Sequence, residues 1–349
     1  MSAELNQQNK QRVLDLWSSL ESTDLGGAAE LFASTMAPDV QWHGHAPLGS
    51  LEGPQAVAEA FWQPLNAAFA GLRRETHVLF GGESNGRADG DLSKDGRWWV
   101  TGTGLLHGTF EQDYLGVPAS GREVNLRWGE FCCIEHGSIT EVYFLIDMVD
   151  LMQQAGFDVL PVAQGHHAMY PAPAAGDGVL TNASDSPTST YSLDHIRSFI
   201  FDGLNAFDES ELASMGMADW FHPDVHWYGP GGIGACLSFK EFEDLHQTPW
   251  LVAFPDREVQ DLDALFAEGA YSAAPGWAGV QATHTGPYLD TPATGKRIDF
   301  NGLDWWKRDG EQYIENWVFV DMVHLFEQFG IDLLEQVRRP ERSGERTSG

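Results

Sequence analysis

Apolar positions in the first part of the chain recur at helical spacing. Val13, Trp17 and Leu20 lie on one side of a helix predicted over residues 5–33, which Gly26-Gly27 interrupts. The pattern then predicts a short strand, a second helix and another strand, over residues 40–44, 54–69 and 75–81. This half of the chain therefore begins with helices that have one apolar face to bury.

The period of the pattern changes to two from about residue 97. Three strand-like runs follow, over residues 98–110, 122–135 and 138–147, with His136-Gly137 as the turn of the last hairpin. Residues 148–155 then read as a short helix. Helices followed by a meander of long strands indicate an α+β fold, with the helices packed on one face of an antiparallel sheet.

The second half of the chain repeats the first. Residues 141–157 return as residues 315–331, and in each copy an aromatic-rich strand runs into an aspartate, Asp147 or Asp321. These aspartates are 174 positions apart, as are YLGVPASGREV and YLDTPATGKRI. Such a repeat indicates two copies of one domain.

The segment between the copies has no period and is rich in Pro, Ala, Gly, Ser and Asp, which is typical of a linker. We therefore predict a first domain, a linker, a second domain and a flexible tail, over residues 1–160, 161–191, 192–338 and 339–349.

Composition limits the partners. With 51 acidic and 20 basic residues the net charge is −31, which disfavours nucleic acid and anionic lipid and makes a strongly anionic substrate less expected, although a local pocket can override net charge. Cys132, Cys133 and Cys236 form no disulfide framework, which fits a reducing compartment. The N-terminus lacks a signal-peptide pattern and no apolar run approaches ~18 residues, so we expect a cytoplasmic protein without membrane spans.

Several motifs carry a resemblance to a known family. They are PDVQWHG, GPQAVAEAFWQPLNAAF and GTFEQDYLGVPASGREVNLRWGEF in the first copy, PDVHWYG, AFPDREV and ATHTGPYLDTPATGKRIDF in the second, and DMVDLMQQAG and DMVHLFEQFG at the copies' ends. Each half resembles the SnoaL-like polyketide cyclases, often labelled predicted ester cyclases, of the NTF2-like superfamily. The resemblance implies two cystatin-like cones, each with helices on a curved antiparallel sheet that closes around an apolar cavity.

The resemblance also implies a reaction. In the aldol cyclases of the family a cavity aspartate removes a proton α to a carbonyl, and the enolate closes a ring, without metal or organic cofactor. By position, Asp147 and Asp321 match that aspartate. Hydrolysis in the same cavity and non-catalytic binding or assembly remain alternatives, because NTF2-like domains host all of these. The aspartates could also simply cap the helices that follow them.

Strand alternation suggests what surrounds each aspartate. An unbroken hairpin places Tyr143, Trp128 and Glu130 on the face of Asp147, and puts Arg127 on the opposite face. The matching set around Asp321 is Trp317, Phe319, Phe300 and Asp304. Burial among aromatic rings and a second acid would raise the pKa of such a base toward neutral pH.

The remaining candidates are histidines and aromatic residues. His107 and His284 could orient the aspartate or polarise a substrate carbonyl, although strand histidines are often structural. The expected ligand-binding residues are Trp42, His43, Trp128, Glu130, Tyr143, Trp227, Tyr228, Asp304 and Trp317. The first copy is the slightly favoured binding half. The expected partner is a small apolar carbonyl compound, and the copies are expected to form an intrachain pseudo-dimer or a homo-oligomer.

Overall fold

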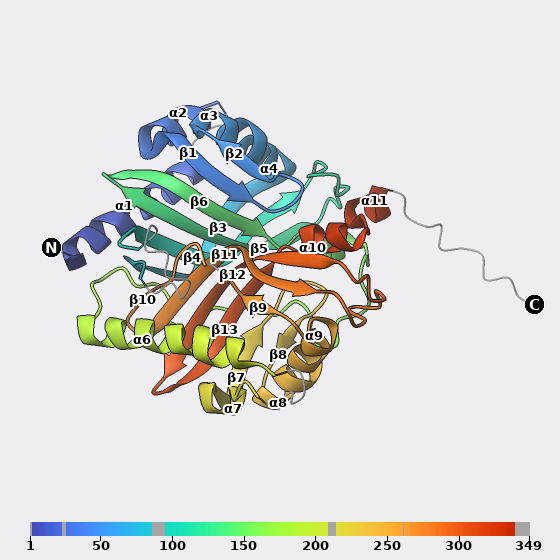
Figure 1. Ribbon diagram of the computed structural model, residues 1–349. Coiled ribbons are helices and arrows are strands. Elements are labelled where there is room, and N and C mark those ends of the chain that lie inside the picture. Colours follow the sequence, from blue (N-terminus) through green and yellow to red (C-terminus); the bar gives the residue numbers. More distant parts are fainter. Residues whose placement is uncertain (1, 23–25, 86–94, 209–213, 261, 339–349) are drawn as a thin grey trace, which may run out of the picture.

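The computed structural model describes residues 2–22, 26–85, 95–208, 214–260 and 262–338; the predicted tail, 339–349, lies outside this range. Two domains stack through their sheets. The sheets lie in the middle and most of the helices lie on the two outer sides (Figure 1). The predicted α+β class and the two cone-like domains are therefore confirmed.

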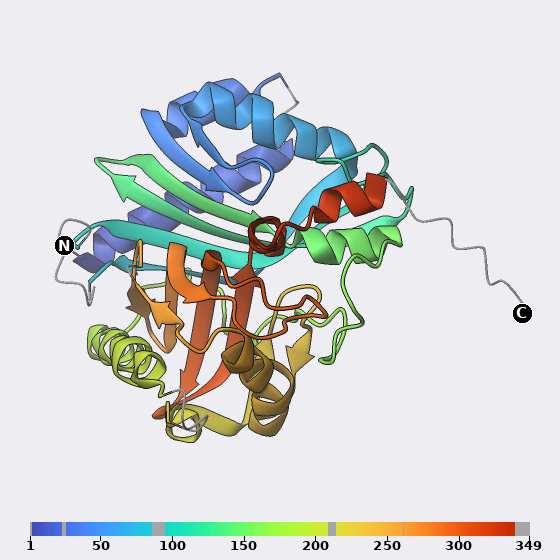
Figure 2. The same ribbon diagram turned by 45° about the vertical axis from the view of Figure 1, so that its right-hand side comes forward.

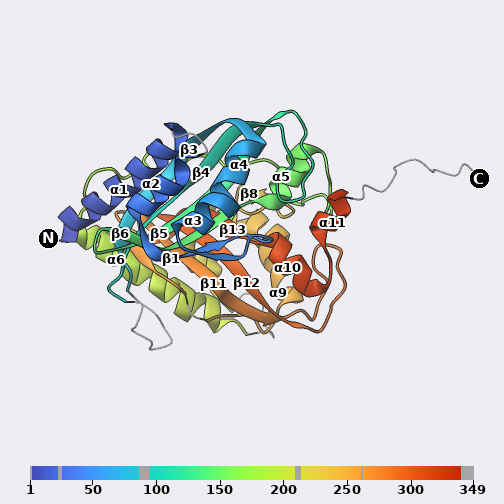
Figure 3. The ribbon, with the colours of Figure 1, turned by 90° about the horizontal axis from the view of Figure 1, so that it is seen from above.

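Domain 1 follows the predicted order of elements, and Figure 3 shows its first helices above the sheet. Its elements are α1 (Ser2–Ser22), α2 (Ala28–Thr35), β1 (Met36–Gly44), β2 (Ser50–Glu52), α3 (Pro54–Val57), a π-helical turn (Ala58–Trp62), α4 (Gln63–Ala68), β3 (Phe69–Glu83), β4 (Trp98–Phe110), β5 (Glu123–Glu135), β6 (Ser138–Ile146) and α5 (Met148–Ala155). The sheet order is β2-β1-β6-β5-β4-β3. Because β1 pairs parallel with β6, the sheet is mixed rather than wholly antiparallel.

Domain 2 repeats this architecture. Its elements are α6 (Ser186–Ser198), a π-helical turn (Phe199–Gly203), a 3₁₀ turn (Leu204–Ala206), α7 (Met217–Trp220), β7 (Phe221–Tyr228), β8 (Ala235–Cys236), α8 (Phe239–Glu241), a π-helical turn (Phe242–Gln247), α9 (Thr248–Ala253), β9 (Glu258–Val259), β10 (Phe266–Glu268), β11 (Tyr271–Thr283), β12 (Arg297–Asp309), β13 (Gln312–Val320), α10 (Met322–Phe329) and α11 (Leu333–Arg338). The main sheet order is β10-β11-β12-β13-β7-β8. Here too the first strand, β7, runs parallel to the last, β13.

A β-bulge in each final hairpin sets which side chains share a face. In domain 1, Ile134 pairs with Ile139 but Cys133 pairs with Glu141, so Thr140 is an extra residue. Ile314 is the equivalent extra residue between Arg308↔Tyr313 and Lys307↔Glu315 in domain 2. A one-residue slip moves every following side chain to the other face of the sheet.

The predicted grouping around the aspartates was therefore wrong. Trp128 pairs with Ile146 and Glu130 with Phe144, so these residues face the helices of domain 1. Tyr143 packs instead between the two domains. In domain 2, Asp304 pairs with Val318 and points away from the face of Asp321.

The inner faces of the sheets form an aromatic interface. Phe131 of domain 1 lies 5.1 Å from Trp305 of domain 2, measured between ring centroids, and the Trp305 indole donates to Thr101 Oγ1 at 2.9 Å. At one end α10 and α11 reach across and lie near α5 (Figure 2). Side chains of these helices join the core of the other domain: Val149 packs into domain 2, and Val323, Leu334 and Val337 pack into domain 1.

The segment predicted as a linker is ordered where it passes between the domains. Tyr170 is buried in the interface, and Trp317 Nε1 donates to the carbonyl of Pro171 at 2.9 Å. His166 bridges to Ala235, and α6 begins at Ser186, inside the predicted linker. Among the described residues, no helix is long and apolar enough to span a bilayer.

Candidate active site

An apolar cavity opens between the helices and the sheet of domain 2. The volume of this cavity is about 200 Å³. At roughly 10–15 Å³ per water, this is room for a ligand of about a dozen or more non-hydrogen atoms. Strands β12 and β13 form its floor, and helical turns form part of its walls. Much of the lining is aromatic and includes Trp227, Phe242, Trp250, Phe300 and Trp306.

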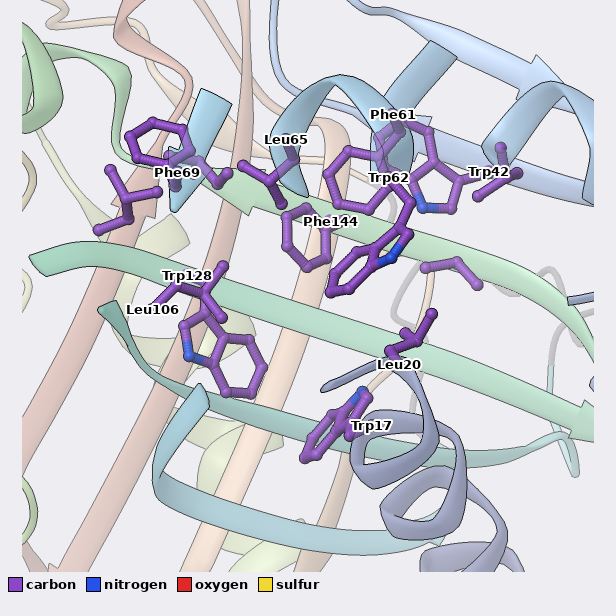
Figure 4. Packing of buried hydrophobic residues seen from close by; sticks show 14 of the residues in the cluster. Trp17, Leu20, Trp42, Phe61, Trp62, Leu65, Phe69, Leu106, Trp128 and Phe144 are labelled. Carbon is purple, nitrogen blue, oxygen red and sulfur yellow. The ribbon is translucent and has the colours of Figure 1, made fainter. Parts of the chain in front are cut away.

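The corresponding space in domain 1 is filled by side chains. Trp128 lies at the position of Gly302, since they are 174 residues apart and pair with Ile146 and Val320, which have the same separation. The Trp128 ring packs edge-on against Trp17 with a centroid distance of 5.1 Å (Figure 4). Trp42, Phe61 and Phe144 complete this core. The apolar cavity therefore lies in the second copy, while the slight preference for ligand binding in the first copy stays a prediction that this packing does not support.

The two copies also use their equivalent acids differently. Glu130 forms an ion pair with Arg74, whose Nη1 donates to Glu130 Oε2 at 3.1 Å. The Arg74 guanidinium lies 3.9 Å from the ring centroid of Trp128. Asp304, its counterpart, lines the cavity instead. Glu130 is thus neutralised within a packed core, whereas Asp304 faces the space where a ligand would lie.

The environment of Asp304 favours its neutral form. Burial raises the pKa of Asp304 to about 8, and a hydrogen bond with the Asn316 side chain lowers it only in part. Asn316 is itself fixed, because its Nδ2 donates to the carbonyl of Trp305 at 2.9 Å. A carboxyl group with a pKa this close to neutral pH can exchange protons in both directions, which suits general acid–base catalysis.

A second polar group of the cavity comes from the helical wall and the segment that follows it. His246 stacks on Trp227 with centroids 4.0 Å apart, and burial, followed by the charge of Arg257, lowers the pKa of His246 to about 3. Arg257 and Gln247 also line the cavity. These side chains offer neutral and cationic groups, while Asp304 supplies the acid.

Asp147 and Asp321 occupy another place. Each caps the following helix: Asp147 Oδ1 accepts from the backbone N–H of Asp150 at 3.0 Å, and Asp321 Oδ1 from that of His324 at 3.1 Å. Their other oxygens reach the opposite domain. Arg127, expected on the far face, lies 3.4 Å from Asp147. The capping interpretation is thus confirmed, while a catalytic role for either aspartate stays a prediction that the cavity does not support.

Most other predicted site residues also lie outside the cavity. His107 Nε2 lies 2.6 Å from Glu75 Oε2 in a half-buried position, and His284 stacks on Phe329 at 4.1 Å. His43 stacks on Tyr143, and Tyr228 packs against Trp317, both at the domain interface. Of the predicted residues, Trp227 and Asp304 line the cavity.

Sequence reasoning missed His246, Arg257 and Asn316, although a signal was present for the first. Phe242, His246 and Trp250 are four residues apart along a helical segment, which places the imidazole within an aromatic stripe. That Asn316 faces the cavity could not be predicted without the bulge at Ile314, because this bulge sets which side chains of β13 share a face. No cluster of three His, Cys, Asp or Glu side chains able to hold a metal occurs among the described residues.

The fold and cavity define a tandem of NTF2-like cones, and comparisons assign the family. The SnoaL-like polyketide cyclase family matches residues 196–329, and the SnoaL-like domain family matches residues 12–142. The chain therefore belongs to the SnoaL-like family, with one such domain in each half.

Solved structures of single domains are also similar. A SnoaL-like polyketide cyclase from Agrobacterium tumefaciens shares 18% identity, with 40% of this chain and 98% of that chain covered and a TM-score of 0.30. An NTF2-like protein from Burkholderia thailandensis shares 17% identity, with 45% and 99% covered and a TM-score of 0.31. No curated protein matches the chain.

Proposed function

We propose that domain 2 is a cofactor-free acid–base catalyst of the cyclase or isomerase kind, acting on a small, largely apolar carbonyl compound. The observation that carries this proposal is Asp304, an acid with a pKa of about 8 on the floor of an apolar cavity. Its ionised form removes a proton α to the carbonyl, and the enolate then attacks a second carbonyl or is reprotonated at another atom. Family membership supports this reaction class.

Domain 1 has a structural role in this proposal. Its cavity is filled by Trp128, and its equivalent acid, Glu130, is paired with Arg74. It supplies the surface on which the sheet of domain 2 packs, as well as the contacts that hold one wall of the cavity.

Proton exchange α to a ketone tests the proposal without knowledge of the natural substrate. 2-Acetonaphthone is a suitable probe, because it is apolar and its methyl protons exchange through an enolate. In D₂O the wild-type protein should accelerate deuterium incorporation measured by NMR. Asp304→Asn should reduce the enzymatic rate by roughly 10²–10⁴-fold.

Asp321→Asn is the matched comparison, because Asp321 is a buried carboxylate of the same domain that lies outside the cavity. Exchange should persist in this variant. Loss of exchange in Asp321→Asn but not in Asp304→Asn would overturn the proposal in favour of the aspartate predicted from the sequence. Binding of the ketone without exchange would instead favour a non-catalytic binding protein.

A further inference from the structure

Arg257 is a buried cation in the wall of the cavity. Arg257 immediately precedes β9 in the chain and is 8% exposed. Nη1 donates to the carbonyl of Leu204 at 3.1 Å, Nη2 contacts the sulfur of Met215, and the guanidinium lies 5.0 Å from the ring centroid of Phe207. Within the described parts of the chain, no carboxylate lies within ion-pair distance of this guanidinium.

The other buried cations differ in this respect. Lys10 is paired with Glu268 at 2.7 Å, Arg127 with Asp150 at 3.2 Å, and Lys307 with Glu315 at 3.3 Å. A buried charge is costly unless it is paired, so each of these pairs is what a folded protein normally requires. Arg257, by contrast, has no anionic partner among the described residues, and it lies beside an apolar cavity.

Arg257 keeps its positive charge at neutral pH even though burial disfavours that charge. Burial lowers the pKa of Arg257 to about 10, which is still well above neutral pH. His246 also lines the cavity, and the charge of Arg257 contributes to lowering the pKa of His246. One wall of the cavity therefore carries a positive charge, in a chain whose net charge is −31.

We propose that the ligand of the domain 2 cavity is an acid: a small, mostly apolar carbonyl compound that also bears a carboxylate, which Arg257 binds. A carboxylate fits because it is planar and brings one negative charge to one guanidinium. The inference deepens the proposed function and rests on the same cavity, but it concerns what the cavity selects rather than the proton transfer at Asp304.

A matched pair of probes tests the selection directly. 2-Naphthoate and 2-acetonaphthone have the same ring system and similar size, but only the first carries a charge at pH 7.5. Binding is measured by calorimetry, or by quenching of tryptophan fluorescence, since Trp227, Trp250 and Trp306 line the cavity. A hydrogen bond to a charged group contributes about 1.5–3 kcal/mol, so the wild-type protein should bind naphthoate roughly 10–100-fold more tightly.

Arg257→Met should abolish this preference, with naphthoate affinity falling at least about tenfold and ketone affinity changing less than about twofold. Arg257→Lys keeps the charge but not the planar fork, and it should keep part of the preference. Circular dichroism and thermal unfolding verify that the variants are folded.

Equal binding of the two probes to the wild-type protein would overturn the inference, and so would an unchanged preference in folded Arg257→Met. The wild-type comparison decides the matter even if that variant does not fold. The result is separable from catalysis: if Asp304→Asn leaves proton exchange intact while the naphthoate preference depends on Arg257, the acid-binding site stands and the proposed reaction fails.

Discussion

The carboxylate of Asp147 in domain 1 accepts a 2.7 Å hydrogen bond from the backbone N–H of Gly231 in domain 2. Arg127 adds a second link, because its Nη1 donates to the carbonyl of Gly229 at 3.0 Å. The loop they hold includes Pro230 and Ile233, which line the cavity. Side chains of the first domain thus position one wall of the cavity in the second.

Replacing Asp147 should therefore affect both stability and ligand binding. Asp147→Ala removes a helix cap and an interdomain hydrogen bond, so we expect the free energy of unfolding to fall by about 1–3 kcal/mol. The cavity wall should also loosen, which weakens the binding of 2-acetonaphthone several-fold. Urea unfolding and calorimetry measure the two effects.

The repeat supplies the control for this experiment. Asp321 Oδ2 accepts from the N–H of Ala46 at 2.7 Å, but that loop belongs to domain 1, whose core is filled. Asp321→Ala should lose a similar amount of stability while ligand affinity stays within about twofold. Equal losses of affinity in the two variants would show that the effect comes from general loosening of the domain interface.

The pH dependence of proton exchange should follow the ionisation of Asp304. A general base is active when ionised, so the rate should rise as the pH increases and level off above the pKa of about 8. Rate profiles between pH 6 and pH 9.5 check this. A rate that falls over the same interval would mean that Asp304 acts as the proton donor instead.

The same group should make stability depend on pH. The pKa of Asp304 is raised from 3.8 to about 8 on folding, so the folded state binds the proton more tightly. Its contribution to stability is fully present below about pH 4 and is lost as the pH rises through about 8. Asp304→Asn should therefore raise the melting temperature relative to wild type at pH 8.5, and the gain should shrink toward pH 4.5. A gain independent of pH would contradict this assignment.

The sequence predicted the order of elements well, because long strands with a period of two and the paired repeats were visible in it. Strand β4 begins and ends where the alternation does, and the His136-Gly137 turn lies between β5 and β6 as expected. The faces of the hairpins could not be predicted. A single extra residue, Thr140 or Ile314, reverses them, and neither residue differs in type from ordinary strand residues.

Which copy holds the cavity depended on similarly local differences. Trp128 and Gly302 are aligned in the repeat, but a tryptophan can either line a cavity or fill it. Only the packing of Trp17 and Arg74 against Trp128 shows that the space is closed. Arg257 was not recognised because its lack of an ionic partner among the residues that the structure describes is a property of three-dimensional contacts rather than of residue type.

Making domain 2 resemble domain 1 should close the cavity. Val318 pairs with Asp304 on the neighbouring strand and lines the cavity beside it, and the equivalent residue in domain 1 is the buried Phe144. Val318→Phe places a ring in the cavity, so the affinities for 2-acetonaphthone and 2-naphthoate should both fall at least about tenfold, while stability is kept or raised because a void is filled. Unchanged affinity in this variant would show that the probes bind elsewhere.

The buried pair of Lys10 and Glu268 should be a main determinant of the domain arrangement. Lys10 of α1 lies 2.7 Å from Glu268 Oε1 of β10 and donates to the carbonyl of Leu180 at 2.6 Å, so it links both domains and the segment between them. Because removing one partner leaves a buried charge, Lys10→Met or Glu268→Gln should each lower the free energy of unfolding by roughly 3–5 kcal/mol.

The double variant separates the pair from its surroundings. It should lose clearly less stability than the two single variants added together, since neither charge is then left alone. Lys240→Met is the control, because Lys240 and Asp244 form an exposed pair on the surface of one domain, and losing that pair should leave the free energy of unfolding nearly unchanged. If urea unfolding instead shows additive losses for Lys10 and Glu268, the two groups act independently, and the interdomain link must be carried by the aromatic contacts between the sheets.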